Sequence, residues 1–217
     1  MPCRAVTFDF NGTLSDDEEI LFAVYAGLFA EHGRPLGRDE YYSRLAGLSE
    51  HEIVRAWLGD RDDLDAIVRE RIDRYRDAVT DGNTVSESMR AAVRFAASRV
   101  PVAVVSGATR AEIEPVVAAA GLAGCFRTIV DDSDVARGKP HPESYELAVT
   151  RLAGHAPGLA PEEVVAFEDT EAGVASAKSA GVRCIALART LPPARLRLAD
   201  EIVDTVDETL LLRLLDG

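Results

Sequence analysis

The stretch DFNGT at residues 9–13 decides the fold of this chain. It follows the apolar run 5–8, which predicts a buried strand near the N-terminus. Because residues two apart in an extended segment point to the same side, we expect Asp9 and Asn11 to face the same way where the strand ends. Gly12 lets the backbone turn and approach a ligand closely. A carboxylate at the carboxyl end of a central strand is typical of open α/β sheets, which place their chemistry at that edge.

Length and charge restrict the class of protein. The 217 residues suffice for one large domain or for a core domain with an insertion. Apolar residues make up 47% of the chain, which favours a folded core over disorder. The formal net charge of −13 argues against nucleic acid and anionic membranes as partners, because both attract basic patches. An anionic metabolite requires a local cation, and Lys139 and Lys178 are the only lysines.

The cysteines and the N-terminal region help to predict the cellular compartment of the protein. Cys3, Cys125 and Cys184 are far apart in the sequence and show no metal-type spacing, so we expect buried, reduced thiols. The first strand is expected by about residue 4, which leaves no room for a signal peptide. No stretch approaches the roughly 18 apolar residues of a membrane span. These features predict a soluble cytoplasmic protein.

Residues 15–82 are predicted to be entirely helical. The segments 15–18 and 49–52 have the pattern of capping boxes, and apolar residues recur at helical spacing after each. The predicted helices cover residues 15–32, 38–45, 49–58 and 64–79. A turn at Asp81-Gly82-Asn83 is expected to form a hinge.

From residue 83 onward, predicted helices and strands alternate. This alternation predicts an α/β fold with a Rossmann-like, doubly wound parallel sheet. The helical stretch interrupts the alternation, so we expect an α-helical cap domain at 15–82 inserted into a core domain formed by 1–14 and 83–217. The later strands are predicted at 100–105, 128–130, 164–167, 182–187 and 202–203, and the later helices at 89–96, from 109, 142–152, 171–180 and 208–215.

Four polar groups of residues each follow a predicted strand. They are Asp9 to Thr13, Ser106-Gly107, Gly138-Lys139-Pro140 and Glu168-Asp169. Because parallel strands end at the same edge of a sheet, all four groups are expected to converge there. This convergence is more informative than any one motif.

The converging residues fit phosphoryl transfer. Asp9 is a candidate nucleophile, because carboxylates can carry an aspartyl-phosphate intermediate. With Asp9, Glu168 and Asp169 offer the hard oxygen ligands that Mg²⁺ prefers. Lys139 supplies a point charge for a phosphate group. Ser106 can donate its hydroxyl to a phosphoryl oxygen, and the alternative for this residue is a role as a helix N-cap.

Together these motifs resemble the haloacid dehalogenase-like superfamily. The resemblance covers the whole chain and rests on four motifs in order, at residues 9–14, 105–107, 138–142 and 167–170, the last followed by Gly173. The spacing looks like the subgroup with a helical cap, which includes phosphoglycolate phosphatases and β-phosphoglucomutases. The resemblance implies a Mg²⁺-dependent hydrolase that acts on a small phosphorylated metabolite through an aspartyl-phosphate, with a cap that covers the site and selects the substrate.

The resemblance also implies roles for individual residues. Asp9 would be the nucleophile, and Mg²⁺ would be bound by Asp9, Asp169 and the backbone carbonyl of Asn11, with Glu168 beside them. The implied catalytic set is Asp9, Asn11, Ser106 and Lys139. The implied phosphate-binding set is Asp9, Phe10, Asn11, Ser106, Gly107 and Lys139.

Asn11 departs from the pattern of the superfamily, in which most phosphatases and mutases have Asp. That Asp is a general acid and base, a role typically worth about 10²–10⁴-fold in rate, and an amide cannot donate and recover a proton in this way. Three explanations stay open. The protein acts slowly or on esters with good leaving groups, Asp16 or Asp17 takes over the proton transfer, or the asparagine is an engineered change that traps a complex.

The segment 44–49 resembles the substrate-specificity loop of the cap. Gly47 would allow close approach to the active site, and Arg44 is either a cation for the substrate or a solvated charge at a helix end. β-Phosphoglucomutases have Lys and Arg where this chain has Ala46 and Glu50, which disfavours a mutase. The alternatives to a phosphatase are therefore a phosphate-binding or regulatory protein with little turnover, favoured by Asn11, and a sugar-phosphate mutase.

Overall fold

A parallel sheet of six strands forms the centre of the protein. The computed structural model describes residues 3–79 and 81–216. The strand order is β3-β2-β1-β4-β5-β6, and neighbouring strands pair in parallel. The strands are β1 (Ala5–Phe8), β2 (Val102–Val105), β3 (Phe126–Val130), β4 (Val164–Glu168), β5 (Arg183–Leu187) and β6 (Glu201–Val203). This sheet confirms the predicted doubly wound α/β fold.

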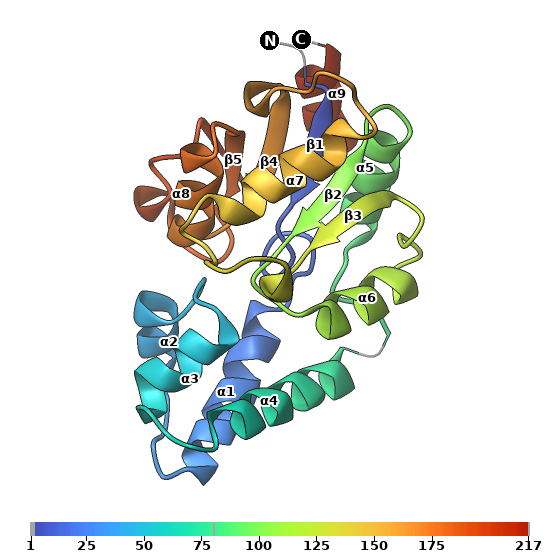
Figure 1. Cartoon of the computed structure of the whole chain (residues 1–217). Helices are drawn as coiled ribbons and strands as arrows, with labels where there is room; N and C mark the ends of the chain where they lie inside the picture. The colour runs from blue at the N-terminus through green and yellow to red at the C-terminus, as the bar shows by residue number, and fades with distance from the viewer. Residues whose placement is uncertain (1–2, 80, 217) are drawn as a thin grey trace.

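Helices cover both faces of the sheet (Figure 1). They are α5 (Glu87–Ala97), α6 (Arg110–Ala119), α7 (Glu143–Ala153), α8 (Glu171–Ser179) and α9 (Glu208–Asp216). Successive residues of a strand point to opposite faces, and β1 shows this directly. Val6 and Phe8 pack in one apolar cluster, which includes residues of α5 and α9, whereas Ala5 packs in a second cluster with residues of α7 and α8. Burial on both faces explains why β1, β2 and β4 read as continuous apolar runs.

Strand β1 lies at the point where the strand order reverses. It pairs with β2 on one side and with β4 on the other. In doubly wound sheets the crevice for ligands opens at the carboxyl ends of the strands at this point. Asp9 directly follows β1 and therefore lies at this crevice.

Four helices lie between β1 and α5 in the chain and form a group of their own. They are α1 (Glu18–Glu31), α2 (Arg38–Arg44), α3 (Glu50–Leu58) and α4 (Leu64–Ala78). Figure 1 shows the group beyond the carboxyl ends of β1 and β2, with α4 next to α6. The all-helical content predicted for 15–82 agrees with these bounds. Among the residues that the structure describes, no helix is long and apolar enough to cross a membrane.

One predicted helix start is wrong. A capping box was expected at 15–18, but α1 begins at Glu18 and its N-cap, Asp17, makes no capping hydrogen bond through its side chain. The Ser15 hydroxyl instead donates to the Thr84 hydroxyl at 2.7 Å. The Asp17 carboxylate turns back toward the loop after β1, because the N–H of Gly12 donates to it at 3.2 Å. Ser15, the expected N-cap, therefore bonds to Thr84 instead of to the start of the helix.

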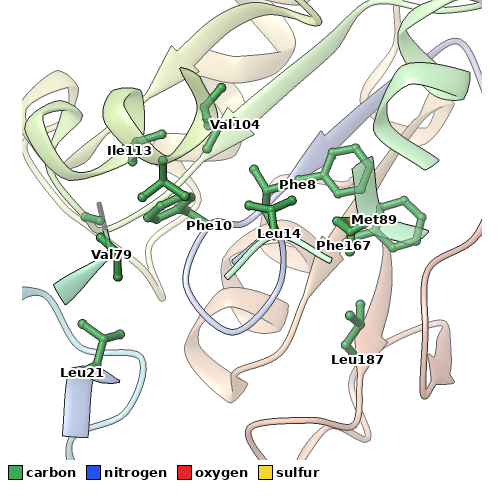
Figure 2. Packing of buried hydrophobic residues seen from close by; sticks show 14 of the residues in the cluster. Phe8, Phe10, Leu14, Leu21, Val79, Met89, Val104, Ile113, Phe167 and Leu187 are labelled. Atoms are coloured by element: carbon green, nitrogen blue, oxygen red, sulfur yellow. The ribbon is translucent and has the colours of Figure 1, made fainter. Parts of the chain in front are cut away.

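The apolar cluster around β1 fixes the direction of that loop. Phe8 stacks on Phe167 of β4, with ring centroids 5.1 Å apart. Figure 2 shows Phe10 among buried side chains that include Val104 and Ile113, and Phe10 is fully buried. Because the residues on both sides of Asp9 are anchored in this cluster, the backbone at Asp9 is held in one place.

Candidate active site

Asp9 and Lys139 form the centre of the site. The Asp9 N–H donates to the carbonyl of Phe167 at 2.9 Å, which extends the pairing of β1 with β4 by one residue. Lys139, in the segment between β3 and α7, donates from Nζ to Asp9 Oδ1 at 2.5 Å, to Glu168 Oε1 at 2.6 Å and to the Val105 carbonyl at 3.0 Å. Burial by itself would lower the pKa of Lys139, but the charges of Asp9 and Glu168 raise it above its usual value. Lys139 is therefore a buried cation directly beside the candidate nucleophile.

Asp9, Glu168 and Asp169 form a compact acidic cluster. One carboxylate oxygen from each lies within 4.8 Å of the others. The cluster is packed against two glycines, since a Cβ at Gly12 would lie 2.0 Å from Asp169 Oδ2 and a Cβ at Gly173 would lie 1.8 Å from Glu168 Oε2. Any side chain at either position would collide with the cluster, which explains why the sequence has glycine there.

The cluster is short of positive charge. Burial, followed by the charges of Asp9, Glu18 and Glu168, raises the pKa of Asp169. Glu168 Oε2 and Asp169 Oδ2 have no hydrogen-bond partner among residues 3–79 and 81–216. Buried charges of like sign are costly unless they are paired or bind a metal. Buried carboxylate oxygens without partners are the ligands that Mg²⁺ accepts, so these residues fit that ion.

Ser106 and Gly107 follow β2 and lie at the same cavity as Asp9. Both line the cavity that contains Asp9, and Ser106 is 4% exposed. Ser106 Oγ accepts a hydrogen bond from the Ala108 N–H at 3.0 Å, so its own proton is free to be donated to an anion. The N-cap of α6 is Thr109, so the alternative reading of Ser106 as that N-cap is wrong.

Asn11 is held by Asp17. Asn11 Nδ2 donates to Asp17 Oδ2 at 3.0 Å, and the Tyr75 hydroxyl donates to the same oxygen. Burial raises the pKa of Asp17 to about 6 against the opposing effect of these hydrogen bonds. Asn11 lines the cavity, whereas Asp17 lies behind it and is 1% exposed. Asp16 is exposed and lies 3.8 Å from Arg189 instead. Neither Asp16 nor Asp17 therefore lines the cavity, as Asn11 does.

Of the two predicted cap residues, Gly47 lines the cavity and Arg44 does not. Gly47 lines the cavity, has φ +89° and lies so close to Thr170 that a Cβ would be 2.9 Å from Thr170 Cβ. Arg44 lies outside the cavity lining, with its guanidinium 5.6 Å from the centre of the Trp57 ring. The expectation that Arg44 supplies a cation to the substrate therefore does not match its position. The side chain of Phe10 is buried in the core, and its backbone is the part of this residue that lies beside Asp9.

The cavity contains functional candidates that the sequence analysis missed. The space in it that water-sized molecules can occupy is about 60 Å³. Besides the predicted residues, its lining includes Glu18, Tyr25, Glu50 and Arg71. Arg71 could have been found, because it is at helical spacing with Ile67, Val68 and Tyr75 on the buried face of α4. An arginine in an apolar stripe indicates a buried partner or a ligand.

Comparisons with known proteins identify the family of this chain. A family model described as haloacid dehalogenase-like hydrolase matches residues 3–181. A phosphorylated carbohydrates phosphatase of Thermotoga maritima is 30% identical over 186 residues, which are 84% of this chain and 83% of that protein. A validoxylamine A 7'-phosphate phosphatase of Streptomyces hygroscopicus subsp. limoneus is 28% identical over 211 residues, 94% of this chain and 95% of that protein.

A solved structure shows the same fold over nearly the whole chain. It is CbbY from Rhodobacter sphaeroides, in a variant with asparagine in place of one aspartate, bound to xylulose-(1,5)bisphosphate. Its TM-score is 0.83 at 26% identity, with 95% of this chain and 96% of that chain covered. The chain therefore belongs to the haloacid dehalogenase-like hydrolase family.

Proposed function

We propose that this protein is a Mg²⁺-dependent phosphatase of a small phosphorylated metabolite, with Asp9 as the nucleophile. The observation that carries the proposal is the arrangement of Asp9 between Lys139 and the acidic pair Glu168-Asp169 at the carboxyl edge of the sheet. A carboxylate, a fixed cation and a metal site within one cavity are the parts that phosphoryl transfer requires. The relatives named as phosphatases support the same chemistry.

The proposed reaction has two displacements at phosphorus. In the first, an Asp9 Oδ–P bond forms as the bond from phosphorus to the ester oxygen breaks, and the departing alcohol oxygen takes a proton from water. In the second, water attacks the aspartyl-phosphate, its hydroxyl stays on phosphorus, its proton is released, and the Oδ–P bond breaks. Lys139 compensates the negative charge on the phosphoryl oxygens in both steps, and Ser106 donates a hydrogen bond to one of them.

Mg²⁺ would be held by carboxylate oxygens of Asp9 and Asp169 and by the backbone carbonyl of Asn11, with Glu168 beside them. The ion would supply positive charge to the phosphoryl oxygens. Glu168 keeps its place without the ion, because Lys139 and the Tyr145 hydroxyl both donate to Glu168 Oε1.

Residues 15–82 would act as the cap over this site, with the core formed by 1–14 and 83–217. The cavity supports this division, since its lining combines residues of the helical group, such as Gly47 and Glu50, with residues of the sheet edge, such as Asp9 and Ser106. A cap that closes over the cavity would exclude bulk water from the displacement.

Asn11 would make the enzyme slow on esters with poor leaving groups. Its amide is held through the Nδ2–H that it donates to Asp17, and an amide cannot release a proton to the leaving group. This same observation favours the second candidate function, a phosphate-binding or regulatory protein with little turnover. The mutase alternative lacks such support, because Ala46 packs against the apolar cluster and Glu50 lies 3.6 Å from Arg71.

The proposal is tested by assaying a panel of phosphate esters with Mg²⁺. We expect wild type to release inorganic phosphate and Asp9→Ala to release none. Exposed Asp73, on the outer side of α4, provides the matched control, and Asp73→Ala should keep the activity. Turnover that survives Asp9→Ala would contradict the assignment of the nucleophile. If wild type binds phosphate esters without hydrolysing any, the binding-protein alternative is correct.

A further inference from the structure

Glu18 is a carboxyl group of the active-site cavity to which the proposed reaction gives no part. It is the first residue of α1, lines the cavity together with Asp9, and is 9% exposed. The Tyr41 hydroxyl of α2 donates to Glu18 Oε2 at 3.1 Å, which fixes the side chain. Glu18 Oε1 accepts no hydrogen bond from residues 3–79 and 81–216 and is not completely buried. One oxygen of this carboxyl group is therefore accessible to water.

Glu18 also connects this cavity with the surface of the protein. It lines a second cavity, in which the space that water-sized molecules can occupy is about 290 Å³. The lining of this second cavity includes the exposed side chains of Asp16, Glu19 and Arg38. Within residues 3–79 and 81–216, Glu18 is the one residue that lines both cavities. A proton on its carboxyl group can therefore exchange with bulk water through the second cavity.

The two other acids of the cavity lining besides Asp9 itself, Glu50 and Asp132, are less suited to move a proton beside the nucleophile. Glu50 lies 3.6 Å from the Arg71 guanidinium, and Asp132 lies in the loop after β3. Burial is the first cause that raises the pKa of all three acids. After burial, Asp9 is among the charges that raise the pKa of Glu18, whereas the charges that act on Glu50 and Asp132 come from other residues. Glu18 is therefore the one whose charge acts on the nucleophile.

Burial keeps a proton on Glu18 at neutral pH. Burial, and next the charge of Asp17, raises the pKa of Glu18 from 4.5 to about 8, although the hydrogen bond from Tyr41 and the charge of Arg71 act in the opposite direction. A helix N-terminus favours the charged form of an acid, but burial disfavours that form more strongly here. A protonated carboxyl group can donate a hydrogen bond, which an ionised one cannot do. The titratable and charged groups around Glu18 are Asp9 and Asp17 of the loop after β1, Tyr25 of α1, Tyr41 of α2, Arg71 of α4 and Asp169 of the loop after β4.

We infer that Glu18 carries the proton for both displacements, in place of the carboxyl group that Asn11 lacks. In the first displacement, Glu18 gives its proton to the water that protonates the departing alcohol oxygen. In the second, the Glu18 carboxylate takes the proton that the attacking water releases, so the group returns to its starting state after each turnover. A proton that passes through water is less effective than one from a carboxyl group in contact with the leaving oxygen, so Glu18 does not fully replace an aspartate at position 11. The role of Glu18 rests on the proposed function, which places the ester at Asp9.

The test compares n-pentyl phosphate, whose leaving alcohol needs a proton, with 4-nitrophenyl phosphate, whose leaving group does not. Glu18→Gln keeps the shape of the side chain and an acceptor for the Tyr41 hydroxyl, but it cannot carry the proton. This variant should lower kcat for the pentyl ester by about 100-fold, the lower end of the range for general acids and bases. For the nitrophenyl ester the first displacement should keep its rate, and slow hydrolysis of the aspartyl-phosphate should produce a burst of nitrophenol. Glu31→Gln, at the other and exposed end of α1, is the matched control and should keep the wild-type rates.

The pH–rate profile gives a readout that a merely structural role of Glu18 would not change. In wild type, kcat for the pentyl ester should fall as pH rises above the pKa of Glu18, because the protonated form is the donor. Glu18→Gln should lack this fall, and Glu31→Gln should keep it.

The outcomes separate the role of Glu18 from the proposed function. Unchanged kcat and an unchanged profile in Glu18→Gln overturn the role and leave the phosphatase in place, as does an equal loss of the first displacement with both esters, or a profile that changes in Asp132→Asn instead. Absence of hydrolysis by wild type overturns the phosphatase, and Glu18 is then judged by the infrared difference spectrum between wild type and Glu18→Gln at neutral pH. The signal of a protonated carboxyl group that the variant lacks supports Glu18 as the proton carrier, and its absence overturns that role.

Discussion

Replacing Asn11 by aspartate should convert the site into one that protonates its own leaving group. Asn11 Nδ2 donates to Asp17 Oδ2 at 3.0 Å, so Asn11→Asp places two carboxyl oxygens at about that separation. Two unit charges at this distance repel by about 5.5 kcal/mol at an effective dielectric constant of about 20, which is equivalent to about four pKa units. Burial already raises the pKa of Asp17 to about 6. The pair should therefore share one proton at neutral pH.

A carboxyl that keeps a proton near neutral pH can act as a general acid, and such a group is worth about 10²–10⁴-fold in rate. We expect Asn11→Asp to increase kcat for alkyl phosphates, whose leaving group needs a proton, by a factor in that range. Aryl phosphates have leaving groups that depart without help, so their gain in the first displacement should be much smaller. The assay is steady-state release of inorganic phosphate from a series of esters with graded leaving-group pKa, at saturating Mg²⁺.

The double variant Asn11→Asp with Asp17→Asn is the control. It restores a hydrogen bond between an amide and a carboxylate, which favours the charged form of the new carboxyl and lowers its pKa. Its pH–rate profile should therefore lose activity at a lower pH than that of Asn11→Asp alone. If Asn11→Asp gave the same gain for every ester, or none, the argument that the amide limits proton transfer would be refuted.

Three further predictions follow from the buried charges. Arg71→Met should lower the free energy of unfolding by about 3–5 kcal/mol, because it leaves Glu112 buried without its ion-pair partner. Arg74→Met, at an exposed ion pair, should cost about 1 kcal/mol or less. Urea denaturation measures both. Burial, and next the charge of Glu112, raises the pKa of Glu50 from 4.5 to about 8. Between these two pH values the unfolded chain binds fewer protons than the folded chain. The free energy of unfolding should therefore fall as pH rises from about 4.5 to 8, by up to about 1.4 kcal/mol per pH unit. Unfolding at pH 5, 6, 7 and 8 should show a shallower fall in Glu50→Gln, and an equal fall would contradict the burial argument. Finally, Mg²⁺ should raise the Tm of wild type but not of Asp169→Asn, in a thermal scan with and without a chelator, and an equal increase in both would place the ion elsewhere.

The sheet and the predicted centre of the site could be derived from the sequence. Apolar runs buried on both faces identify β1, β2 and β4, and covalent order places a polar motif at the end of each of these three strands. Parallel pairing then requires Asp9, Ser106 and Glu168 to meet at one edge, whatever the details of packing. Lys139 follows the same rule from the loop after β3. The glycines beside the acidic pair are also explained once that edge is known.

The directions and partners of several side chains were decided only by the tertiary structure. Asp17 was considered as a group that takes over proton transfer, but the loop after β1 orients its carboxylate toward Asn11 and Gly12, behind the cavity. The arginine that reaches the cavity is Arg71 and not Arg44, because the packing of α4 against α6 brings it to Glu112, 41 residues away.

The physical reason for this division is the range of the interactions involved. Periodicity, capping patterns and motif order depend on residues close in sequence, and they determine which elements form and which edge of the sheet carries the chemistry. The unpartnered atoms of Tyr25 and Arg71 depend on how separate helices pack over that edge, and local sequence patterns do not encode this packing. The sequence by itself determined which polar side chains meet at one edge of the sheet, and only the tertiary structure decided which residues of the helical group pack over them.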